Sequence, residues 1–267
     1  MPERRQRGRP RAFHDKTEQN TIQSLDRALT ILETLGQAGG LSLTELASTL
    51  DQSPATVYRV LTTLEQHGVA ELEPATQKWH IGAGAFRIGS AFLRRTNLVD
   101  RARPVMQALM QATGETANLG VENGARVLFV SQVETHASIR AFFPPGTQSP
   151  LHASGIGKAL LAQRDPAQID AVIDTGLERF TKCTLTDRDA LLADLRTIRQ
   201  RGYAIDDEER NDGMRCVASP VFNATGVAVA GLSISGPTAR VSPDRINEMA
   251  ARVCDAAATL SQRLGAP

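Results

Sequence analysis

The stretch Ser53-Pro54-Ala55-Thr56-Val57-Tyr58-Arg59-Val60-Leu61 decides how the first part of this sequence folds. Ser53 is a favoured N-cap residue, and Pro54 suits the first helical position, where its missing N–H costs no hydrogen bond. An apolar face follows at helical spacing, made of Val57, Val60, Leu61 and Leu64. We therefore predict a helix that begins after Ser53 and ends near Gly68.

A second helical pattern lies directly before this one. Ser42-Leu43-Thr44-Glu45 has the spacing of a capping box, in which the Ser and Glu side chains each accept a backbone N–H. Its apolar stripe consists of Leu43, Leu46, Ala47 and Leu50. Only Asp51-Gln52 separates the two helices, and an earlier helical pattern covers residues 25–32. This spacing predicts a helix-turn-helix.

The polar face of the later helix indicates contact with nucleic acid. In a helix-turn-helix, the N-terminal part of the second helix enters the major groove of DNA. No acidic residue lies within residues 53–64, and a hairpin over residues 69–73 and 78–81 predicts a wing. The candidates for contact with double-stranded DNA are Ser53, Thr56, Tyr58, Arg59, Thr62 and Lys78. The alternative is a plain three-helix bundle with a solvated polar face.

Residues 1–20 form a basic tail, which the sequence predicts to be disordered. Within it, Arg7-Gly8-Arg9-Pro10-Arg11 resembles the core of an AT-hook, in which an extended Arg-Pro segment lies in a narrow minor groove. Arg7, Arg9 and Arg11 are thus further candidates for DNA contact. The alternative is a tail that only keeps the protein in solution.

Composition excludes several other classes of protein. The chain has 267 residues, 41% of them hydrophobic, and a net charge of +1, so it can fill one large or two ordinary cores. No apolar run approaches the ~20 residues that span a bilayer, and the Arg-rich start is not a secretory signal. Cys183, Cys216 and Cys254 lack CxxC spacing. The sequence predicts no metal, no cofactor and no membrane association, and a cytoplasmic location.

The rest of the chain predicts an α+β domain with an antiparallel sheet. A helix over residues 98–113 is interrupted by Pro104 or begins there. Strands are expected at residues 116–121, 126–133, 139–143, 216–222 and 227–233. Further helices are expected at residues 158–163, 167–175, 187–201 and 243–264.

Several separated motifs, in order, resemble the IclR-type bacterial transcription regulators over about residues 21–264. The motifs are Gln23-Ser24-Leu25-Asp26-Arg27-Ala28-Leu29, residues 53–61, Leu151-His152-Ala153-Ser154-Gly155-Ile156-Gly157-Lys158-Ala159-Leu160-Leu161, Asp206-Asp207-Glu208-Glu209, Gly213-Met214-Arg215-Cys216-Val217-Ala218 and Leu232-Ser233-Ile234-Ser235-Gly236-Pro237. The resemblance implies a winged helix-turn-helix at 21–82, a linker helix at 83–97 and a GAF/PAS-like effector-binding domain at 98–267. It also implies a homodimer or homotetramer.

The same resemblance implies a site for a small carboxylate effector. In family members that sense glyoxylate or pyruvate, the matching positions that line the ligand site are Gly155, Ile156, Asp206, Cys216, Ser233 and Ser235. From the residues alone, Gly155-Ile156-Gly157 predicts a turn that opens a helix, and two serines two apart on a strand share one face. Ile156 replaces a commoner small Ala. If only its backbone faces the ligand, the replacement matters little; if its side chain points inward, the pocket shrinks.

Other interpretations remain open at this stage. Cys216 can be a small buried hydrophobe, and the two serines can be ordinary strand-end hydrogen-bonding residues. The effector can be a larger hydroxy or aromatic acid. Cys216 as nucleophile with His152 as base would make an enzyme, although no cysteine-hydrolase signature surrounds them. A third interpretation is an architectural DNA-binding protein that uses only the tail and the helix-turn-helix, but it gives the second domain no function.

Overall fold

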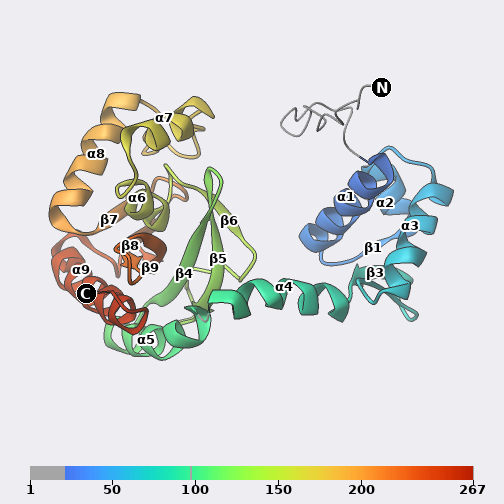
Figure 1. Ribbon diagram of the computed structural model, residues 1–267, viewed down its shortest axis with the longest axis horizontal. Coiled ribbons are helices and arrows are strands. Elements are labelled where there is room, and N and C mark those ends of the chain that lie inside the picture. The colour runs from blue at the N-terminus through green and yellow to red at the C-terminus, as the bar shows by residue number, and fades with distance from the viewer. Residues whose placement is uncertain (1–21, 97, 267) are drawn as a thin grey trace, which may run out of the picture. The chain divides into compact units, whose positions relative to one another are not determined.

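The computed structural model describes residues 22–96 and 98–266, so the candidates Arg7, Arg9 and Arg11 lie outside the described residues. The chain divides into two compact units, Met1–Phe92 and Leu93–Pro267, and the division falls inside α4 (Ala83–Thr96). Both units are drawn in Figure 1.

The N-terminal unit is a helix-turn-helix with a wing. Its elements before α4 are α1 (Gln23–Ala38), β1 (Leu41–Ser42), α2 (Leu43–Thr49), α3 (Pro54–Gln66), β2 (Ala70–Glu73) and β3 (Lys78–Ile81). The three short strands form one antiparallel sheet in the order β1-β3-β2. Trp79 on β3 is buried in the core with Ile31, Leu35, Leu46, Val57 and Leu61. The core thus joins all three helices to the wing.

Local sequence signals set the ends of the two central helices. The capping box is confirmed at α2: Ser42 Oγ accepts from the N–H of Glu45, whose carboxylate accepts from the N–H of Ser42. The predicted start of α3 is also confirmed, with Ser53 as N-cap and Pro54 at the first turn. Asp51 lies in the connection between the two helices, and its φ of 49° puts it in the left-handed region of backbone conformation.

The C-terminal unit is built on a six-stranded antiparallel sheet in the order β6-β5-β4-β9-β8-β7. The strands are β4 (Thr116–Asn123), β5 (Arg126–Val133), β6 (Gln148–Pro150), β7 (Ala204–Asp207), β8 (Met214–Phe222) and β9 (Ala228–Pro237). The helices are α5 (Leu98–Thr113), α6 (Gly155–Leu161), α7 (Pro166–Asp174), α8 (Arg188–Arg201) and α9 (Ile246–Arg263), the last preceded by a 3-10 turn, Pro243–Arg245.

Helices cover both faces of this sheet (Figure 1). On one face, α5 and α9 pack on alternate strand residues that include Ala117, Leu119, Val217 and Ile234. On the other face, Ile156 from α6 and residues of α7 and α8 pack with Phe129 and Ala218. Because side chains alternate along a strand, each central strand has one apolar face under α5 and α9 and a second face turned toward α6.

Two expectations about the C-terminal unit are wrong. Residues 139–143 form no strand; the strand that pairs with β5 on this side is β6, through residues 126–128 of β5. The segment is held by other contacts: Thr116 Oγ1 donates to the carbonyl of Ala141, and Phe143 stacks on Phe129 with ring centroids 5.1 Å apart. Pro104 neither begins nor interrupts α5, which runs from Leu98 to Thr113 with the proline inside it.

Candidate functional site

The polar face of α3 presents the expected DNA-contact residues to solvent. Tyr58 and Arg59 are exposed, and Arg59 forms no ion pair within residues 22–96. Ser53 Oγ caps the helix by accepting from the N–H of Thr56 at 3.2 Å. Thr62 Oγ1 donates to the carbonyl of Tyr58 at 2.9 Å, so this hydroxyl is already used within the helix. Thr62 therefore offers a partner its methyl group and an acceptor oxygen, but no free donor.

The wing adds one exposed cation. Lys78 opens β3, where its Cα pairs with both Ser42 and Glu73. Charge over the whole unit is unfavourable to DNA, because residues 22–92 contain four Lys and Arg but seven Asp and Glu. The tail cancels this charge but does not reverse it, since residues 1–21 contain six Lys and Arg against three Asp and Glu.

The sheet brings five of the six expected effector-site residues together around the sulfur of Cys216. Ser235 Oγ donates to Cys216 Sγ at 3.2 Å, and the hydroxyl of Ser233 and the N–H of Gly155 are also directed at this sulfur. A Cβ added to Gly155 would lie only 3.0 Å from Sγ, so glycine permits the close approach of α6 to β8. Asp206 and Cys216 are register partners on β7 and β8.

Asp206 is held at the end of β7 by the loop that follows it. One carboxylate oxygen accepts the backbone N–H of Glu209 at 2.8 Å and that of Arg210 at 3.4 Å. Burial raises the pKa of Asp206 to about 6, although Lys158 and these two N–H groups oppose the rise. The carboxyl can therefore change its protonation state when a neighbouring charge arrives.

The side chain of Ile156, the sixth expected residue, packs beside this cluster and not into its centre. It lies over Gly120 and Gly231, which pair across β4 and β9: a Cβ added to Gly231 would lie 2.6 Å from Cγ2 of Ile156, and one added to Gly120 would lie 3.3 Å away. The isoleucine thus fills the space that two facing glycines leave open. Only its backbone remains beside Gly155.

Two amides belong to the cluster that sequence reasoning missed. Asn118 on β4 is fully buried, and its Nδ2 lies 3.1 Å from Ser235 Oγ and 3.5 Å from Ser233 Oγ. Gln132 on β5 donates from Nε2 to Oδ1 of Asn118 at 3.0 Å. The available signal was a polar Asn between the apolar residues Ala117 and Leu119 of one strand.

A buried ion-pair network supports the site from behind α6. Lys158 Nζ lies 2.7 Å from Oδ2 of Asp194 on α8 and 2.5 Å from Oε1 of Glu209. Burial lowers the pKa of Lys158, but the two carboxylates outweigh it and the pKa is raised. Burial raises the pKa of Glu209 to about 7, with Lys158 opposing the change. The network ties α6 and α8 to the loop that holds Asp206.

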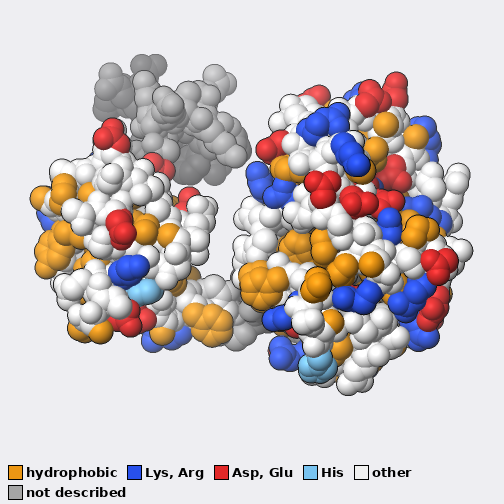
Figure 2. Space-filling view, turned by 180° about the vertical axis from the view of Figure 1, so that it is seen from behind, with side chains coloured by type: hydrophobic (Ala, Val, Ile, Leu, Met, Phe, Trp, Pro, Cys, Tyr) orange, Lys and Arg blue, Asp and Glu red, His pale blue; other side chains and the backbone are white. Residues whose placement is uncertain are grey.

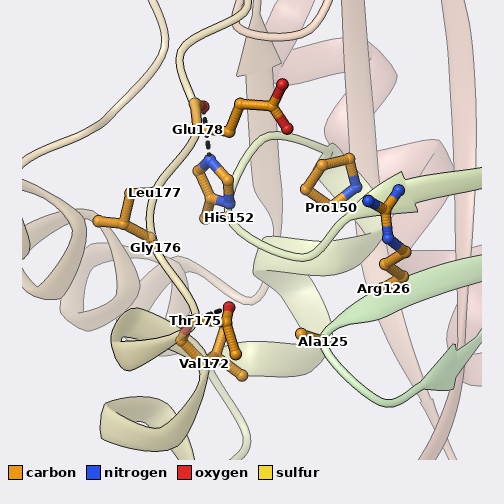
Figure 3. A pocket seen from close by; sticks show the side chains of 9 residues that line it. All are labelled: Ala125, Arg126, Pro150, His152, Val172, Thr175, Gly176, Leu177 and Glu178. Carbon is orange, nitrogen blue, oxygen red and sulfur yellow. Dashed lines mark hydrogen bonds between the residues drawn. The ribbon is translucent and has the colours of Figure 1, made fainter.

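His152 is a structural residue in this arrangement. Its Nε2 lies 3.0 Å from the carbonyl of Glu178, and because a carbonyl only accepts, Nε2 carries the proton (Figure 3). The ring borders a cavity of about 470 Å³, which Arg126 and Glu178 also line. No hydrogen bond joins His152 to Cys216 among residues 98–266.

Cys216 is also poorly suited to act as a nucleophile. Burial raises the pKa of its thiol to about 11, with the charge of Asp206 acting in the same direction. The thiolate that attacks a substrate is therefore scarce at neutral pH. In the part of the chain that the structure describes, no group of His, Cys, Asp or Glu side chains is arranged to hold a metal ion. No helix there has the length and apolar character needed to cross a membrane.

The surface of the C-terminal unit carries both signs of charge. On the face shown in Figure 2, basic and acidic side chains are interspersed over this unit. A polyanion such as DNA is attracted to surfaces where positive charge gathers. On that face, this unit therefore shows no concentration of positive charge that would attract DNA.

Comparison with known proteins agrees with both units. The IclR helix-turn-helix domain matches residues 24–74, and the bacterial transcriptional regulator IclR C-terminal domain matches residues 90–262. The HTH-type transcriptional regulator BhcR of Paracoccus denitrificans is 56% identical over 261 residues, covering 96% of this chain and 94% of that protein. The HTH-type transcriptional repressor AllR of Klebsiella pneumoniae is 38% identical over 268 residues, covering 99% and 98%.

Solved structures show the same architecture. The IclR of Thermotoga maritima matches with a TM-score of 0.76 and 30% identity, over 92% of this chain and 100% of that one. An IclR homolog from Microbacterium hydrocarbonoxydans, complexed with 4-hydroxybenzoate, shares the fold with a TM-score of 0.80 at 24% identity, over 90% and 98%. The relatives are named as regulators and repressors, not enzymes, which rejects the interpretation of this chain as a cysteine-dependent enzyme. This chain belongs to the IclR family of bacterial transcriptional regulators.

Proposed function

We propose that this regulator binds operator DNA with α3 and its wing, and that a two- or three-carbon oxo acid changes its affinity for DNA. Glyoxylate is the first candidate and pyruvate the second. The observation that carries the ligand proposal is the convergence of small donors on one point. Gly155 N–H and the hydroxyls of Ser233 and Ser235 all surround Cys216 Sγ, with Asp206 alongside.

This set of groups suits a very small acid. Hydroxyl and N–H donors satisfy carboxylate oxygens, and a carboxyl group with a pKa near 6 can meet a hydroxyl, a hydrate or a protonated partner. An aromatic acid needs room for a ring, and Ile156 occupies the space over the paired glycines. We therefore expect 4-hydroxybenzoate, the ligand of the Microbacterium homolog, to bind much more weakly here.

The DNA-contact proposal has two parts. Ser53, Thr56, Tyr58, Arg59 and Thr62 of α3, with Lys78 of the wing, form the proposed contact set over residues 21–82, ahead of a linker at 83–97. Arg7, Arg9 and Arg11 supply the positive charge that residues 22–92 lack. Operator DNA as the target implies that the protein acts in the cytoplasm.

We also propose that the protein acts as a homodimer or homotetramer. Exposed apolar side chains gather on α1 and α4, namely Leu25, Leu29, Phe86 and Ile88. Exposed apolar side chains on two helices can be buried against a second copy of the chain. Sedimentation of the full chain measures the assembly directly.

Calorimetry and thermal shift test the ligand. At ~100 times its dissociation constant, a true ligand adds about 2.7 kcal/mol to the free energy of unfolding. Ser235→Ala should weaken glyoxylate binding by ~1–3 kcal/mol, because one ligand oxygen loses its donor. Cys216→Ser should change affinity while the protein stays folded. No heat with glyoxylate or pyruvate for the wild type rules out this ligand class.

A selection from random DNA identifies the operator, and gel shift on the selected site then measures the effect of glyoxylate on DNA affinity. A wild-type protein that binds glyoxylate but whose DNA affinity is unchanged by it would contradict the proposed regulation. Loss of selection after Arg59→Ala would support α3 as the reading helix.

A further inference from the structure

A row of polar side chains crosses the sheet beneath α6. Gln132, Asn118 and Ser233 are successive register partners on β5, β4 and β9, and Ser235 pairs with Cys216 on β8. Residues opposite one another in antiparallel strands point to the same face. The row therefore leads from Gln132 at its outer end to Cys216 within the proposed effector site.

The directions of these hydrogen bonds depend on one another. A serine hydroxyl has a single proton, and that of Ser235 is given to Cys216 Sγ at 3.2 Å. Its 3.1 Å contact with Asn118 must then be received from the amide nitrogen Nδ2. This orientation turns Oδ1 of Asn118 toward Gln132, whose Nε2 donates to it at 3.0 Å. The amides of Gln132 and Asn118 are thus matched, with the nitrogen of one facing the oxygen of the other.

The serine protons are directed away from Asn118 as a result. While Nδ2 of Asn118 donates to the serine oxygens, the hydroxyls can donate only to other partners, which are the sulfur now and a ligand later. A carboxylate accepts hydrogen bonds and donates none, so it matches such a site. A primary amide of the same shape brings two N–H donors, which would face other donors without a partner.

We propose that Gln132 and Asn118 form an amide relay that keeps the hydroxyls of Ser233 and Ser235 as donors, and so makes the effector site select a carboxylate over its amide. The identity of the ligand rests on the proposed function; the relay itself does not. Asn118 and Gln132 act through the serines and are positioning residues.

Two substitutions at Gln132 test the relay in the full chain. In Gln132→Glu the carboxylate can only accept, so Asn118 must turn Nδ2 toward it and present Oδ1 to the serines. The serine protons then go to Asn118, and the site loses its donors. Gln132→Met has a similar volume and no charge, so it removes the bias without reversing it.

Calorimetry with glyoxylate and with its neutral amide, glyoxylamide, gives the first measurement. The wild type should prefer the carboxylate, and Gln132→Glu should reduce this preference by roughly tenfold or more. Gln132→Met should fall between them. Gln132→Met separates orientation from charge, because it removes the amide without adding an anion near the site.

A second measurement needs no ligand. In a background of Cys183→Ser and Cys254→Ser, the rate at which Cys216 reacts with methyl methanethiosulfonate reports the donors at its sulfur. Hydroxyl donation stabilises the reactive thiolate. The rate should therefore fall in the order wild type, Gln132→Met, Gln132→Glu, with about a tenfold total difference. If Gln132 only packs, its substitutions should lower the melting temperature but should not produce this order of reaction rates.

The two measurements separate two kinds of failure. A wild type that binds no glyoxylate overturns the proposed ligand, and the ordered reaction rates still support the relay. A wild type that binds glyoxylate, with the same carboxylate preference and the same Cys216 rate in all three proteins, overturns the relay.

Discussion

The ammonium of Lys158 lies 2.5 Å from Oε1 of Glu209, and both side chains are buried. The other carboxylate oxygen of Glu209 is buried with no hydrogen-bond partner among the described residues. The backbone N–H of Glu209 donates to Asp206. One ion pair thus connects the helix that contributes Gly155 to the loop that positions Asp206.

Lys158→Met should destabilise the protein by about 3–5 kcal/mol, because it leaves buried carboxylates without their cation. Chemical denaturation of the full chain measures the change. Arg164→Met is the matched control: its ion pair with Glu122 lies nearer the surface and should be worth about 1 kcal/mol or less. Adding Glu209→Gln to Lys158→Met should recover part of the loss, and no recovery would show that packing alone explains it.

The contribution of Glu209 to stability should fall as pH rises from about 4.5 to 7. Burial raises the folded-state pKa of Glu209 to about 7 from the ordinary 4.5, so in this window the unfolded chain loses a proton that the folded chain keeps. The free energy of unfolding then decreases with pH, by on the order of 2 kcal/mol over the window. Glu209→Gln removes this contribution. The difference between the two proteins in urea should therefore change with pH, and a constant difference would contradict the prediction.

Gly155→Ala should distort the proposed effector site. Its methyl group would lie 3.0 Å from Cys216 Sγ and 3.3 Å from the Cβ of Ala218, so α6 must move away from β8. We expect about 1–3 kcal/mol of destabilisation, and weaker glyoxylate binding. Adding Cys216→Ala should restore stability by making room. Gly89→Ala, where nothing lies within 4 Å of an added Cβ, should be neutral or slightly stabilising.

Arg59→Ala should reduce affinity for the selected operator by ~1–3 kcal/mol, the value of a bidentate Arg–guanine contact. Arg59→Lys keeps the charge and loses the planar fork. If Arg59 reads a base, the lysine variant should bind DNA with less sequence preference; if it contacts phosphate, the lysine variant should resemble the wild type. Arg196→Ala on α8 controls for the loss of one exposed arginine.

Deleting residues 1–11 should weaken DNA binding more at low salt than at high salt. The deletion removes five arginines from a chain whose residues 22–92 are net acidic. The slope of log affinity against log salt should become shallower by about 0.9 for each phosphate group that the tail neutralises in the wild type. Thermal denaturation verifies that the shortened protein is folded. An unchanged slope would show that the tail does not bind the phosphates.

Features that depend on neighbouring residues could be predicted from the sequence. Ser42 and Glu45 lie three residues apart, as do Ser53 and Thr56, so the helix starts are encoded within one turn. The strand predicted at residues 139–143 shows the limit of local patterns. Its residues favour a strand, yet the folded chain holds the segment by other contacts, such as the ring of Phe143 stacked on that of Phe129.

The amide relay could not be predicted in the same way. Asn118 and Ser235 are 117 residues apart, and they meet only because β4 and β9 pair in one register. The register of β4 against β5 also shifts between Leu119 and Gly120. No spacing rule in the sequence reports such a shift, so the partner of Gln132 follows only from the folded sheet.

Alternation of side chains along β8 and β9 places the apolar core and the polar row on opposite faces of the sheet. Val217 and Ile234 pack under α5 and α9, while their neighbours Cys216, Ser233 and Ser235 face α6. A substitution in the polar row therefore leaves the apolar layer on the opposite face intact. Substitutions at a few alternate positions of these strands can therefore change which small molecule the proposed site accepts, without a new core.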